Sequence, residues 1–64
     1  METPLKRTLR AITARDPRPI KALRLLTNSG ALTPEHQALV AEHYGFAPTF
    51  AVMGVLRELA KEEE

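Results

Sequence analysis

The sequence predicts an all-α protein, a compact bundle of four short helices that forms a single domain over residues 1–64. No segment alternates apolar and polar residues for long enough to make a strand. Four of the five prolines stand where a helix could begin, and two of the three glycines stand where one should end. We therefore expect helices over about residues 4–14, 17–28, 34–44 and 48–62.

The first three of these helices begin at a proline that follows a capping side chain. These pairs are Thr3-Pro4, Asp16-Pro17 and Thr33-Pro34. The capping oxygen can accept a hydrogen bond from a free helix amide, and proline lacks a donor that would be unpaired there anyway. Ala47-Pro48 has the proline without the cap. Gly30 and Gly45 should end the second and third helices, because glycine readily adopts the left-handed backbone of such an end.

Apolar residues recur at helical spacing in the first three helices, and they predict the core. The first helix offers Leu5, Leu9 and Ile12, and the second offers Ile20, Ala22, Leu23, Leu25 and Leu26. The third helix offers Ala38, Leu39, Val40 and Tyr44, with Glu35, Gln37 and Glu42 largely outside.

The last helix is unusual because residues 50–56 carry neither a charge nor a side-chain hydroxyl. A helix that is apolar on nearly every face must be covered on nearly every face. Three short helices should cover only part of it, so we expect a second copy or another protein to cover the rest. The expected interface residues are Phe50, Ala51, Val52, Met53, Gly54 and Val55. The alternative is a compact monomer in which the N-terminal helix folds over this face.

The net charge of +1 hides an asymmetry between the two halves of the chain. Residues 1–30 hold seven basic and two acidic residues, whereas residues 31–64 hold two basic and six acidic residues. The basic half suggests either a polyanion site or head-to-tail self-association. The candidate phosphate contacts are Lys6, Arg7, Arg10, Arg15, Arg18, Lys21 and Arg24. The competing interpretation is a solvated face that keeps a small protein soluble.

Residues 41–49, with the sequence AEHYGFAPT, resemble the turn of helix-turn-helix transcription regulators. In that resemblance Ala41 allows close helix approach, Gly45 makes the turn and Phe46 packs into the core. The wider order over residues 19–60 is similar to the three-helix core of winged-helix regulators, without the wing. The resemblance places Thr49, Val52 and Met53 toward a DNA groove. Of these three residues, only Thr49 carries a group that reads base edges, so the resemblance adds it to the nucleic-acid-binding candidates.

Two functions follow from these patterns. The first is a small nucleic-acid-binding regulatory protein that contacts phosphates through its basic half and dimerises through its last helix. The alternative is a protein–protein interaction module, an adaptor or inhibitor, that docks the apolar last helix on a partner and binds no nucleic acid.

Other functional classes are not expected from this sequence. We expect no enzyme activity, because no Ser/His/Asp set or carboxylate pair has supporting residues. His36 and His43 lack a well-placed third ligand, so we expect neither a metal nor a cofactor. No apolar run approaches the length of a membrane span, and there is no cysteine. A cytoplasmic location without membrane contact is the expectation.

Overall fold

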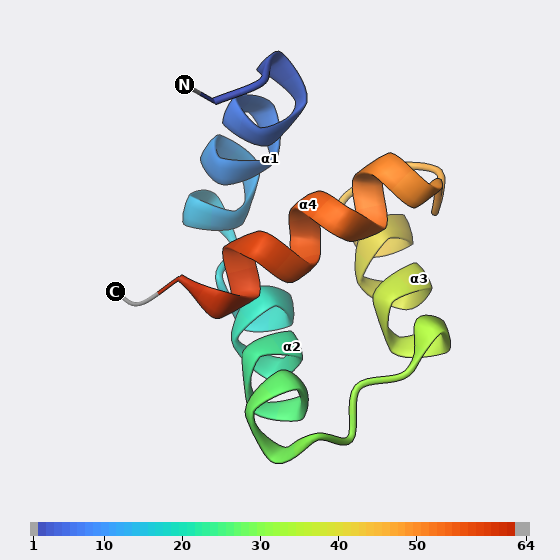
Figure 1. Ribbon diagram of the computed structural model, residues 1–64. Coiled ribbons are helices and arrows are strands. Elements are labelled where there is room, and N and C mark those ends of the chain that lie inside the picture. Colours follow the sequence, from blue (N-terminus) through green and yellow to red (C-terminus); the bar gives the residue numbers. More distant parts are fainter. Residues whose placement is uncertain (1, 63–64) are drawn as a thin grey trace.

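The computed structural model describes residues 2–62 and shows four helices joined by short connections (Figure 1). They are α1 (Pro4–Arg15), α2 (Arg18–Ser29), α3 (Pro34–His43) and α4 (Phe50–Lys61). Residues 2–62 contain no strand, and the predicted all-α, four-helix fold is confirmed. Glu63 and Glu64, which were counted in the acidic half, lie outside the described residues.

Two of the predicted helix starts are confirmed. The Thr3 hydroxyl accepts from the Lys6 amide at 3.2 Å, and the Thr33 hydroxyl accepts from the His36 amide at 3.2 Å. Each threonine satisfies an amide that has no partner within its own helix.

Two other starts differ from the prediction. Helix α4 begins at Phe50 rather than Pro48, because Thr49 is its cap and accepts from the Val52 amide at 3.3 Å. Helix α2 begins at Arg18, directly after Pro17, and no side chain caps its first turn. The expected cap, Asp16, is engaged elsewhere, as described below.

Both helix ends predicted at glycines are confirmed. Gly30 has φ of +75° and Gly45 has φ of +85°. At Gly45 the Phe46 amide donates to the Ala41 carbonyl at 2.9 Å, and the Gly45 amide donates to the Glu42 carbonyl at 3.0 Å. This pair of bonds satisfies carbonyls at the end of α3 and turns the chain toward α4.

Helix α4 crosses the other three helices and contacts each of them (Figure 1). The buried core is Leu9, Ile20, Leu23, Ala41, Val52, Leu56, Leu59 and Ala60. The three largest fully buried side chains, Leu9, Leu23 and Leu56, come from α1, α2 and α4. The N-terminal helix therefore covers part of α4, as the monomer alternative requires.

The core prediction was wrong at four positions. Leu25 is 71% exposed and Leu39 is 63% exposed, and Ala22 is also exposed. Leu25 stands two residues after buried Leu23, which places it nearly opposite on a helix of about 3.6 residues per turn. Gln37, expected outside, is buried because it lies one turn before buried Ala41.

Candidate nucleic-acid interface

Three basic side chains converge on an open groove between α1, α2 and the end of α4. They are Arg10, Lys21 and Arg24. The other lining residues are Thr13, Ala14, Pro17, Ile20, Leu59 and Glu62. The fold thus brings together cations that lie in two different helices, and Glu62 is the one acidic residue among the lining residues described.

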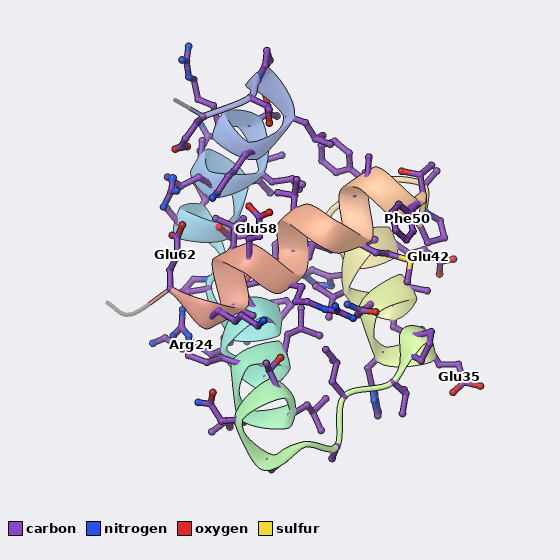
Figure 2. All side chains as sticks on the ribbon, viewed as in Figure 1. Arg24, Glu35, Glu42, Phe50, Glu58 and Glu62 are labelled. Atoms are coloured by element: carbon purple, nitrogen blue, oxygen red, sulfur yellow. The ribbon has the colours of Figure 1, made fainter. Side chains whose placement is uncertain are left out.

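Arg24 has a structural contact in this groove. Its Nε donates to the Ala60 carbonyl at 2.9 Å, so the guanidinium lies against the C-terminal turn of α4 (Figure 2). A cation is favourable there because the helix end carries unpaired carbonyls and partial negative charge. Arg24 therefore ties α2 to the end of α4 as well as lining the groove.

Lys6 and Arg10 are paired with acidic residues of α4 and its cap. Lys6 Nζ lies 3.0 Å from Glu58 Oε1 and 3.4 Å from Glu62 Oε2. Arg10 holds the Glu62 carboxylate with two parallel bonds, of 2.6 Å and 3.0 Å, and its Nε pairs with Glu2 at 2.8 Å. The hydrogen bond from Arg10 holds the pKa of the Glu62 carboxyl below its usual value. The basic and acidic halves of the sequence therefore meet within one chain.

The remaining basic candidates are exposed. Arg7 lies in the first half of α1, and Arg15 and Arg18 flank the connection to α2. The Arg18 side chain is 89% exposed, with Nε 3.6 Å from Asp16 Oδ1. Lys21 is exposed at the groove. Arg15, Arg18 and Lys21 thus lie at or within one helical turn of the α1–α2 connection.

Thr49, the candidate from the resemblance, is exposed at the start of α4. Its hydroxyl caps the helix, accepting from the Val52 amide. The same oxygen retains a donor proton and a second lone pair.

A contact that the sequence did not predict fixes the α1–α2 connection against α3. His43 Nε2 lies 2.8 Å from Asp16 Oδ2, and the Tyr44 hydroxyl donates to the Asp16 carbonyl at 2.6 Å. The two rings meet edge to face, with centroids 5.3 Å apart. Burial raises the pKa of Tyr44, which keeps the phenol in its donating form. Asp16 is 27 residues before His43, and no pattern in the sequence links them.

Acid should weaken this contact. The hydrogen bond with His43 lowers the pKa of Asp16, and the Arg18 charge adds to the effect. A lowered folded-state pKa gives stability that is present above the unfolded value, about 3.9, and is lost as pH falls through the folded value. We expect Asp16→Asn to lower the melting temperature at neutral pH and to reduce its further fall below about pH 4. Melting curves of wild type and variant that fall in parallel with pH would contradict this.

The predicted interface on α4 is only partly at the surface. Phe50 is 95% exposed, and Ala51 and Gly54 are exposed as well. Met53 and Val55 are half-buried, whereas Val52 is only 6% exposed and belongs to the protein's own core. A second groove, lined by Gln37, Phe50, Met53, Gly54 and Arg57, runs beside this exposed face.

No protein family, curated protein or solved structure matches this chain. Within residues 2–62, no three His, Cys, Asp or Glu side chains are grouped so that they could hold a metal ion. None of the helices described is long and apolar enough to cross a membrane.

Proposed function

We propose that the protein is a small regulatory protein that binds the phosphate backbone of nucleic acid. The observation that carries this proposal is the convergence of Arg10, Lys21 and Arg24 on one groove. The exposed Arg15 and Arg18 extend the same basic surface over the α1–α2 connection. Phosphates spaced along a strand fit an open surface of this kind better than a single small anion does.

The binding should depend little on base sequence. The first turn of α4 presents Phe50 and Ala51 to solvent, and neither carries a donor or acceptor that could read a base edge. Phosphate contacts by Arg and Lys provide affinity and position without sequence information. Two copies joined through the exposed face of α4 would double the number of such contacts.

The test is a salt titration of binding to a short labelled DNA duplex, with an RNA duplex measured in parallel. The variant Arg18→Gln/Lys21→Gln should weaken binding and should lower the slope of log affinity against log salt by about 1.8, because each lost phosphate contact removes about 0.9. The matched control is Arg57→Gln/Lys61→Gln, which removes the same charge from exposed α4 positions outside this groove. We expect the control to keep most of the wild-type slope.

Equal slopes for the two variants would contradict the assignment of this surface. A folded wild type that binds neither duplex at about 50 mM salt would contradict the proposed function as a whole.

A specific observation also favours the second function, an interaction module. Phe50 is almost completely exposed beside the groove that Met53, Gly54 and Arg57 line. Large exposed aromatic residues are enriched at protein interfaces. Absence of nucleic-acid binding, together with a self-association or partner affinity that Phe50→Ala abolishes, would favour this function over the first.

A further inference from the structure

The carboxylates at the end of α4 pair with two basic side chains of α1. Glu62 holds Arg10 through two parallel bonds, from Nη1 at 2.6 Å and from Nη2 at 3.0 Å. Arginine grips a phosphate with the same fork geometry. Lys6 Nζ is engaged at the same time by Glu58, at 3.0 Å, and by Glu62, at 3.4 Å.

We infer that Glu58 and Glu62 act as an internal competitor, which covers Lys6 and Arg10 and which a nucleic-acid backbone must displace. The inference rests on the proposed function and concerns the regulation of Arg10, which lines the same groove, and of Lys6, about one turn before it on α1. It divides the cations into an open set, with Lys21 and the Arg18 side chain, and a covered set, with Lys6 and Arg10.

Displacement is feasible because these pairs lie at the surface. All four side chains keep part of their area exposed, so water and salt weaken each pair. A duplex presents phosphates at high density, whereas α4 presents two carboxylates here. Lys6 and Arg10 therefore contribute to binding only when a ligand presents negative charge more densely than the two carboxylates do. This condition disfavours weak polyanions and single phosphates as ligands.

Glu35 and Glu42 offer a matched control for this inference. They lie on α3, whereas Glu58 and Glu62 lie on α4 and its cap (Figure 2). Both variants, Glu58→Gln/Glu62→Gln and Glu35→Gln/Glu42→Gln, remove two negative charges. Only the first should release Lys6 and the Nη1 and Nη2 groups of Arg10, whose Nε keeps its pair with Glu2. Binding of the labelled duplex is measured for both across a salt series, after circular dichroism has shown that each variant is folded.

We expect the Glu58→Gln/Glu62→Gln variant to bind more tightly than both wild type and the control. Its slope should be steeper by about 1.8, because wild type gains these two phosphate contacts only by freeing two carboxylates, which take up cations again. Between about 50 and 200 mM salt it should lose about twelvefold more affinity than wild type loses. Adding Lys6→Gln and Arg10→Gln to this variant should restore the wild-type slope.

The outcomes separate this inference from the function on which it rests. If wild type binds and the two glutamine pairs change the affinity and slope equally, the carboxylates act through net charge alone and the inference is overturned. If neither wild type nor any variant binds either duplex, the proposed function fails, and this inference fails with it.

Discussion

Leu56→Ala should unfold a large part of the population, whereas Phe50→Ala in the same helix should leave the stability of the monomer nearly unchanged. Leu56 is 0% exposed and Phe50 is 95% exposed. Removing a buried leucine side chain costs about 2–5 kcal/mol through lost burial and the cavity that remains. A domain of this size has a free energy of unfolding of only a few kcal/mol, so that cost approaches the total.

Chemical denaturation followed by circular dichroism measures both effects. A Leu56→Ala midpoint close to that of wild type would show that α4 does not complete the core as described. The Phe50→Ala measurement should be repeated over a range of protein concentrations. A stability difference that appears only at high concentration would reveal association through Phe50, because a dimer is stabilised by mass action.

Gly45→Val should destabilise the protein by more than about 1 kcal/mol, the cost that is typical of a single substitution. Gly45 has φ of +85°, in the left-handed region that β-branched residues avoid. A Cβ atom added there would meet nothing within 4 Å, so the cost comes from the backbone conformation and not from a clash. Thermal unfolding measures the loss.

Gly54→Ala is the matched control, since a Cβ atom at Gly54 also meets nothing within 4 Å and Gly54 lies inside α4. Alanine should raise the stability there by about 0.5–1 kcal/mol, because it favours the helix more than glycine does. A Gly45→Val protein that melts like wild type would place the turn elsewhere and would remove the basis of the helix-turn-helix resemblance.

The helix boundaries could be predicted where local chemistry decides them. Thr3, Thr33, Gly30 and Gly45 act on the backbone within a few residues, so the sequence contains what is needed. Asp16 was predicted as a cap by the same reasoning, but a hydrogen bond with a residue of α3 engages its carboxylate instead. A tertiary contact of this kind overrides a local preference and leaves no periodic signal.

The candidate site was visible in the sequence only as an excess of charge. Which cations are open and which are covered depends on the end of α4 lying beside α1. Glu62 stands 52 residues from Arg10, and only the packing of the helices brings the two together. For the same reason the apolar run of α4 could not separate Val52, which is buried, from Phe50, which is exposed.

The position of α4 across the other three helices has a consequence for synthesis of the chain. Half of the buried core residues described, namely Val52, Leu56, Leu59 and Ala60, come from this helix, which is the last of the four to be made. On the ribosome α1, α2 and α3 emerge without the surface that buries Leu9 and Leu23. A nascent chain stalled before Val52 should therefore remain open and sensitive to protease, and the core should form only after α4 has left the exit tunnel.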